Sequence, residues 1–123
     1  MKRVPLLWLV AGVGLGVGAA RATQDTHFLA LDGRDWSRFG AGERMAWTQG
    51  FLAGQAVRGV ADSLGADTTR FAAELERQRK AGEFRFPYAP ALYLNRMSDH
   101  YVWDNHRMQP LWRGMMETNA VRR

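Results

Sequence analysis

One long helical pattern, from Ala41 to Leu64, constrains the fold more than any other feature of this sequence. When its residues are placed every 100° around a helix, the apolar ones cover a broad side and the polar ones a narrow side. The broad side holds Met45, Ala46, Leu52, Ala53, Ala56, Val57, Val60, Ala61 and Leu64, and the narrow side holds Arg44, Thr48, Gln55, Arg58 and Asp62. We therefore predict a long, mostly buried helix that ends at Gly65 and packs against other helices.

Small side chains form a stripe along this predicted helix. Its members are Ala46, Gly50, Ala53, Gly54, Val57 and Ala61. Glycine inside a helix costs roughly 0.5–1 kcal/mol relative to alanine, so Gly50 and Gly54 favour close approach of another helix. That helix can belong to the same chain or to a second copy in a homodimer. Beside the stripe, Trp47 and Phe51 have the i,i+4 spacing at which two rings can pack as a pair.

Helical patterns continue through the rest of the chain, separated by turn residues. Three further helices are predicted. They run from Asp67 to about Ala81, from Pro90 to Trp103 and from Pro110 to about Asn119, and Gly82 ends the first of them. The segment Phe84 to Phe86 is the one short strand-like piece. The sequence therefore predicts an all-α fold, a compact bundle of about four helices after an N-terminal signal helix.

The N-terminal segment has the three-part form of a secretory signal peptide. Lys2 and Arg3 form a basic start, residues 4–19 are an uncharged apolar run, and Ala20-Arg21-Ala22 is a suitable cleavage site. The run is shorter than the roughly 17–25 residues of a membrane-spanning helix, so cleavage after Ala22 is favoured over retention as an anchor. We expect an exported protein, periplasmic or secreted, with no stable membrane span once residues 1–22 are removed.

Removal of the signal peptide lowers the formal net charge of the chain from +5 to +2, because three basic residues leave with it. A nucleic-acid-binding domain normally carries a much stronger basic face, so that class is excluded.

The mature chain divides into an N-terminal arm (23–35), a single helical domain (36–118) and a frayed tail (119–123). The sequence has no cysteine. Core packing or oligomerisation must therefore supply the stability that disulfides often give small exported proteins.

The stretch from Ser98 to Trp112, "SDHYVWDNHRMQPLW", gathers most of the side chains that could carry function. On a continuous helix His100 and Asp104 would face one ion, and His106 could join them where the helix breaks. This is fewer ligands than most zinc sites use, so a metal site at His100, Asp104 and His106 is the alternative interpretation, and no cofactor is expected. Catalysis has no recognisable arrangement here, because no nucleophile motif or phosphate loop accompanies the carboxylates. We predict a protein that is not an enzyme.

The same stretch is also typical of a joint between two helices. Asp104 and Asn105 suit a turn, and Pro110 suits the start of the next helix. Tyr101, Trp103 and Trp112 could bridge the two helices, with their polar ends at the surface. The helix break could also display aromatic and basic groups together, which is typical of a protein-binding surface. The predicted partner-binding residues are Trp103, His106, Arg107 and Trp112.

Two motifs resemble a known family. The segment "GRDWSRFGAGERMAWTQGFLAG" has the pattern G-x-x-W followed by G-F-x-x-G, and "LYLNRMSDHYVWDNHRMQPLW" has an aromatic residue, a D-x-N-like turn and a proline. This order is similar to that of the Tai and Rap immunity proteins, small exported helical proteins of bacteria. Those proteins bind and block a type VI secretion toxin, often a peptidoglycan amidase, in the periplasm. The resemblance implies framework roles for Trp36, Trp47, Gly50, Phe51, Gly54, Tyr101, Asn105 and Pro110.

These observations favour an exported, non-enzymatic helical protein that binds another protein. The resemblance makes a secreted toxin the candidate partner and an immunity protein the candidate role. A homodimer, a metal-binding periplasmic protein and a structural envelope protein are the alternatives.

Overall fold

The computed structural model describes residues 27–120. The signal peptide expected at residues 1–22, its cleavage after Ala22 and the last residues of the expected tail lie outside the described residues. The chain divides into two units after Ala30. In the first unit the structure describes a single 3-10 turn, η1 (His27–Leu29), with Phe28 and Leu29 exposed.

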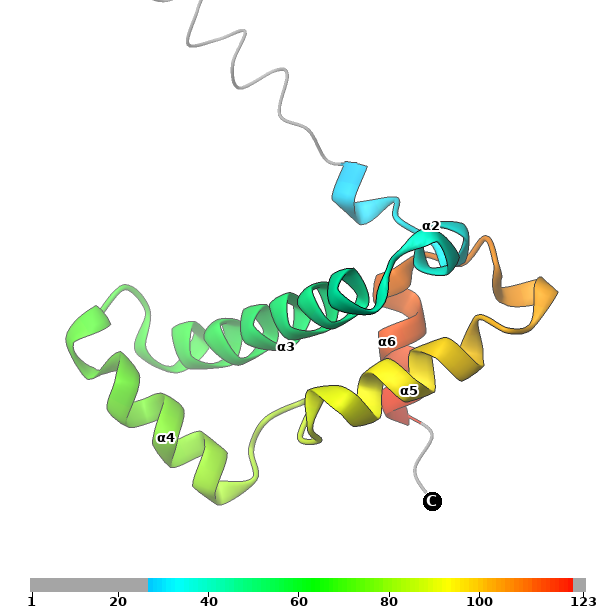
Figure 1. The fold of residues 1–123 in the computed structure, drawn as a ribbon. Helices are drawn as coiled ribbons and strands as arrows, with labels where there is room; N and C mark the ends of the chain where they lie inside the picture. Colours follow the sequence, from blue (N-terminus) through cyan, green and yellow to red (C-terminus); the bar gives the residue numbers. More distant parts are fainter. Residues whose placement is uncertain (1–26, 121–123) are drawn as a thin grey trace, which may run out of the picture. The chain divides into compact units, whose positions relative to one another are not determined.

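The second unit, described from Leu31 to Ala120, is all-helical. Its α-helices are α2 (Gly33–Arg38), α3 (Ala41–Leu64), α4 (Phe71–Ala81), α5 (Pro90–His100) and α6 (Leu111–Ala120), with 3-10 turns η2 (Thr68–Arg70) and η3 (Asp104–His106) between them. The all-α prediction is confirmed, and the four longer helices are the predicted bundle (Figure 1). The described residues contain no strand, so the strand-like piece predicted at Phe84 to Phe86 was wrong. No helix within residues 27–120 is long and apolar enough to cross a membrane.

The helical unit begins earlier than the boundary at residue 36 that the sequence suggested. The Leu31 carbonyl accepts a hydrogen bond from Leu111 N at 2.8 Å, and Asp32 forms an isolated antiparallel bridge with Pro110. The Asp32 carboxylate accepts from Arg34 N at 2.8 Å, and Asp35 accepts from Asp32 N at 2.9 Å, which caps the start of α2. These contacts tie residues 31–35 to the helices.

The helix ends show which local signals the chain uses. The bounds of α3 agree with the prediction, and Gly65 and Gly82 end α3 and α4 with positive φ of 62° and 68°. The second predicted helix starts later than Asp67, because Asp67 caps the 3-10 turn η2 instead. The last helix continues to Ala120, beyond the point at which fraying was expected.

The third predicted helix is shorter than expected. α5 ends at His100 and not at Trp103. The last carbonyls of a helix have no partner within it and need another donor. Here the His106 imidazole lies 2.8 Å from the His100 carbonyl through Nδ1. This contact satisfies the His100 carbonyl, while the Met97 and Asp99 carbonyls accept from Tyr101 N at 3.1 Å and Val102 N at 3.3 Å.

The core lies where the first half of α3 meets α2, α5 and α6. Its buried members are Trp36, Phe86, Tyr93, Met97, Tyr101, Leu111 and Met115. Trp47 and Phe51 stack at 5.5 Å between ring centroids, which confirms the predicted pair, and Phe51 meets Phe86 edge-on at 5.1 Å. The aromatic contacts therefore connect α3 to the segment that leads into α5.

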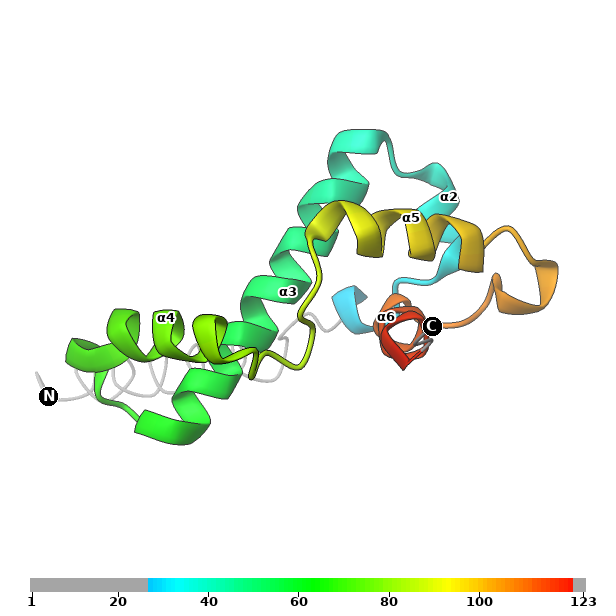
Figure 2. The same cartoon turned by 90° about the horizontal axis from the view of Figure 1, so that it is seen from below.

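The prediction that α3 is mostly buried was wrong. Thr48 and Val60 are the buried residues of this helix, and Val57 on the predicted apolar side is exposed. α5 and α4 both pack on α3, with α5 towards its first half and α4 along its second half, so part of its surface stays uncovered (Figure 2). Thr48, expected on the polar side, is buried, and its hydroxyl is satisfied there because it donates to the Arg44 carbonyl at 2.8 Å.

The close approach predicted at Gly50 and Gly54 does not occur within the described residues. A Cβ added at either glycine would meet nothing within 4 Å. The crowded glycines are instead Gly33 and Gly114, which both lie against the Tyr101 ring. At Gly114 an added Cβ would lie 2.5 Å from the Tyr101 hydroxyl oxygen. Close packing in this fold therefore surrounds a tyrosine.

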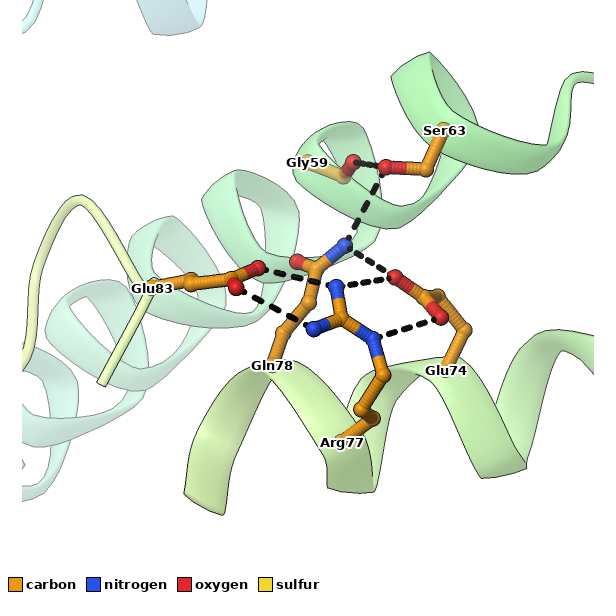
Figure 3. A network of polar contacts seen from close by, with 6 residues as sticks. All are labelled: Gly59, Ser63, Glu74, Arg77, Gln78 and Glu83. Carbon is orange, nitrogen blue, oxygen red and sulfur yellow. Dashed lines mark hydrogen bonds and ion pairs between the residues drawn. The ribbon is translucent and has the colours of Figure 1, made fainter. Parts of the chain in front are cut away.

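A polar network joins α4 to the second half of α3 and to the segment after α4 (Figure 3). Gln78 is buried, and its Nε2 donates to Ser63 Oγ at 3.3 Å and to Glu74 Oε1 at 3.0 Å. Arg77 pairs with Glu74 at 2.7 Å and with Glu83 at 2.9 Å. The hydrogen bonds from Arg77 lower the pKa of Glu74 to about 2.

Candidate protein-binding site

The chain between α5 and α6, together with the first turn of α6, exposes four large apolar side chains, and we call them the connection surface. They are Val102 (74% exposed), Trp103 (65%), Met108 (73%) and Trp112 (48%). Trp103 and Trp112 were predicted from the sequence as partner-binding residues, whereas Val102 and Met108 were missed. From the sequence, Trp103 and Trp112 were expected to bridge the two helices. Both indoles are instead largely exposed to solvent.

Tyr101 holds both ends of this connection. Its ring is buried against Gly33 and Gly114, and its hydroxyl donates to the carbonyls of Gln109 at 3.2 Å and Pro110 at 2.9 Å. Burial raises the pKa of the Tyr101 hydroxyl, which therefore stays protonated and keeps donating. Residue 101 is thus fixed to residues 109 and 110, and the intervening loop is closed at its base.

His106 holds the middle of the connection. Its ring lies against the ring of His100, with centroids 4.0 Å apart and planes inclined by 11°. Because a carbonyl oxygen can only accept, the His106 Nδ1 that contacts the His100 carbonyl must carry a hydrogen. The His100 Nε2 lies 2.9 Å from Gln109 Oε1 and 3.6 Å from Glu117 Oε2. The two imidazoles therefore have fixed orientations.

The structure does not bring His100, Asp104 and His106 together as metal ligands. The i,i+4 relation between His100 and Asp104 does not form, because α5 ends at His100. The Asp104 side chain is 95% exposed and lies 3.7 Å from Arg107 Nη1. Within residues 27–120, no group of three or more His, Cys, Asp or Glu side chains is arranged to hold a metal ion.

A groove with a volume of about 280 Å³ opens beside the connection surface. We call it the α5–α6 groove, and its lining residues are Arg96, Asp99, His100, Trp103, His106 and Thr118. Arg96 and Thr118 were not singled out in the sequence. A signal for most of the groove was nevertheless present, because Arg96, Asp99 and His100 have the three- and four-residue spacing of one helix face.

The framework residues implied by the resemblance fall into two groups. Trp36 is buried and its indole Nε1 donates to Ser98 Oγ at 3.3 Å, while Trp47 meets it edge-on at 6.1 Å. Trp36 and Tyr101 belong to the core, and Trp47 and Phe51 pack on it. Pro110 forms the isolated bridge with Asp32. Gly50, Gly54 and Asn105 are exposed instead.

The chain matches no protein-family model, no curated protein and no solved structure. Its function is therefore inferred from the geometry of the connection and its groove.

Proposed function

We propose that this protein is exported and acts by binding another protein through the connection surface. The observation that carries the proposal is the exposure of Val102, Trp103, Met108 and Trp112 along one short part of the chain. Tryptophan and methionine are enriched at protein interfaces, and tryptophan is enriched among the residues that dominate binding energy. Arg107 is exposed in the same connection, and arginine is also enriched among the residues that dominate binding energy.

The way the connection is held supports the same proposal. A loop that must be ordered on binding loses affinity, because its conformational entropy is lost at that moment. Here Tyr101 closes the base of the connection and His106 is held at its middle, so the apolar side chains are presented on ordered backbone. We expect little change of backbone structure when the partner binds.

A secreted toxin is the partner that the resemblance to Tai and Rap immunity proteins favours. The signal peptide expected at residues 1–22 would deliver the protein to the periplasm, where such a toxin acts. In this role the protein would bind and block the toxin and would need no catalytic residues of its own.

A homodimer is the second candidate, and one observation favours it. The face of α3 around Gly50 and Gly54 is not covered by any helix within the described residues. Packing against another helix of the same chain, within the described residues, therefore does not explain the small residues at these two positions. A second copy could use that face, which is separate from the connection surface.

Native mass spectrometry of the protein isolated from the periplasm of its own host tests these alternatives in one spectrum. We expect a chain that begins at Thr23, bound to a different protein. A chain that retains residues 1–22 would contradict cleavage, and a homodimer with no second protein would favour the α3 face. A bare monomer with one tightly held metal ion would contradict the proposal.

A further inference from the structure

The volume of the α5–α6 groove lies just below the range that is usual for small-molecule sites. Sites for whole small molecules usually enclose about 300–1,000 Å³ and bury most of the ligand. The groove has about 280 Å³ and shares Trp103 with the connection surface. A partner that covers the connection surface would therefore place one of its own side chains in the groove.

The groove presents hydrogen-bond acceptors. Because His106 Nδ1 donates to the His100 carbonyl, the Nε2 of the neutral His106 ring has a lone pair and no hydrogen. Asp99 is exposed, and among residues 27–120 its carboxylate makes no ion pair or hydrogen bond. The Thr118 hydroxyl uses its hydrogen to donate to the Met115 carbonyl at 3.2 Å, so its oxygen can only accept another bond.

The groove also presents flat aromatic surface. The Trp103 indole is 65% exposed and belongs to the lining. Tryptophan is the aromatic side chain that attracts cations most strongly through its ring face. A carboxylate, an acceptor nitrogen and an indole in one groove match a cationic donor and not an anion.

Arg96 is the one positive charge in the lining, and its guanidinium is held by Tyr88 and by Thr118, which also lines the groove. Its Cζ lies 5.1 Å from the ring centroid of Tyr88, which is not a lining residue, and its Nη1 donates to the Thr118 carbonyl at 3.2 Å. Arg96 therefore weakens the attraction for a cation without filling the acceptor sites.

We propose that the α5–α6 groove binds a basic side chain of the partner protein, with arginine favoured over lysine. A planar guanidinium can stack on the Trp103 indole while it donates to the Asp99 carboxylate and to His106 Nε2. An ammonium group can form the ion pair but cannot stack in the same way. This inference rests on the proposed function only for the identity of the donor, because the groove itself can be tested without a partner.

The first test titrates the purified mature protein with acetyl-arginine-N-methylamide at pH 8, where imidazoles are ordinarily neutral. Binding is followed by NMR at the Trp103 indole N–H and the Asp99 amide. We expect saturable shifts with Kd on the order of millimolar, as weak contacts of one side chain allow. Acetyl-citrulline-N-methylamide has nearly the same shape without the charge and should bind about tenfold or more weakly. Equal binding of the two, or tighter binding of acetyl-glutamate-N-methylamide, would overturn the proposal.

Matched variants locate the binding. Asp99→Asn removes the groove carboxylate and should weaken arginine binding about tenfold, whereas Asp104→Asn removes the same charge from an exposed side chain outside the groove and should change it less than about twofold. Arg96→Gln should strengthen binding, provided that its melting curve shows a folded protein. If both aspartate variants bind equally, or if Arg96→Gln abolishes binding in a folded protein, the assignment of a cation to the groove is wrong.

The same variants separate this inference from the proposed function once a partner has been captured. Weaker capture by Asp99→Asn than by Asp104→Asn would support both. Equal capture by the two would reject the basic side chain and leave the connection surface as the binding site. If no partner is captured, the proposed function fails, and the arginine titration still decides what the groove binds.

Discussion

The His106 imidazole closes the C-terminal end of α5 by donating from Nδ1 to the His100 carbonyl, 2.8 Å away, while its ring stacks on the His100 ring. A residue beyond the helix thus supplies the hydrogen bond that a further helical turn would have supplied. This contact lies at the end of α5, and the His106 ring that makes it also lines the groove. The proposed site depends on the same contact.

Replacing His106 should loosen the connection. His106→Phe keeps a flat ring but removes the donor, so the His100 carbonyl loses its partner and stability should fall by about 1 kcal/mol. His106→Asn places an amide donor near the same position and should recover part of the loss. Urea unfolding measures both values, and equal stability of the phenylalanine variant and the wild type would show that the hydrogen bond contributes nothing.

Gly114→Ala should destabilise the fold, because the new methyl group would overlap the Tyr101 ring. Overpacking of this kind costs about 1–3 kcal/mol. Gly54→Ala is the matched control inside another helix, and it should raise stability by roughly 0.5–1 kcal/mol because the position is open. Thermal unfolding of both variants compares the two glycines. A stabilised Gly114→Ala would mean that Tyr101 is not packed there.

Tyr101→Phe tests whether closing the base of the connection matters for binding. The variant loses the hydroxyl that donates to Gln109 and Pro110, and stability should fall by about 1 kcal/mol. Tyr93→Phe is the control, because the Tyr93 hydroxyl also donates, to Asn119 Oδ1 at 2.7 Å, but away from the connection. Both variants should lose similar stability, whereas Tyr101→Phe alone should weaken partner capture. Equal capture by the two would contradict the role given to Tyr101.

Stability should fall at acidic pH. The hydrogen bond from Arg34 lowers the pKa of Asp32, and Arg77 lowers that of Glu74 to about 2. A carboxyl whose pKa is lower in the folded state contributes stability that is complete above its ordinary pKa of about 4 and is lost as the pH falls through the folded value. Urea unfolding between pH 6 and pH 2 should therefore show a decline below about pH 4. Asp32→Asn should be less stable at pH 6 and should show a smaller decline.

Local signals in the sequence were sufficient for the long elements of the fold. The apolar periodicity and the two glycine stops gave α3 its bounds from Ala41 to Leu64 and gave α4 its end at Gly82. The pairing of Trp47 with Phe51 also follows from spacing within one helix. These features depend on residues that are neighbours along the chain.

The features that failed depend on residues far apart in the sequence. Periodicity identifies the apolar side of α3 but not how much of it other helices cover, so Val57 was expected to be buried and is exposed. Gly33 and Gly114 are crowded only because both meet Tyr101, and neither has a local signature of close packing. The last carbonyl of α5 is bound by His106, which lies beyond the helix.

The candidate site was predictable in part for the same reason. The predicted helix break and its aromatic and basic residues indicated Trp103, Arg107 and Trp112, and the structure places all three at the surface. The groove also needs Thr118 from α6, and no spacing in the sequence indicates that α6 meets α5 at that point. The hydrogen bond from His106 Nδ1 to the His100 carbonyl also forms only in the folded chain, so the sequence could not predict it.

The most direct test of the account compares two pairs of substitutions in partner capture from the periplasm. Trp103→Ala with Met108→Ala removes exposed apolar area from the connection surface, and Val57→Ala with Leu92→Ala removes exposed apolar area elsewhere. We expect the first pair to lose at least tenfold in affinity with an unchanged melting temperature, and the second pair to bind as the wild type does. Loss of binding by the second pair with retention by the first would contradict the connection surface as the binding site.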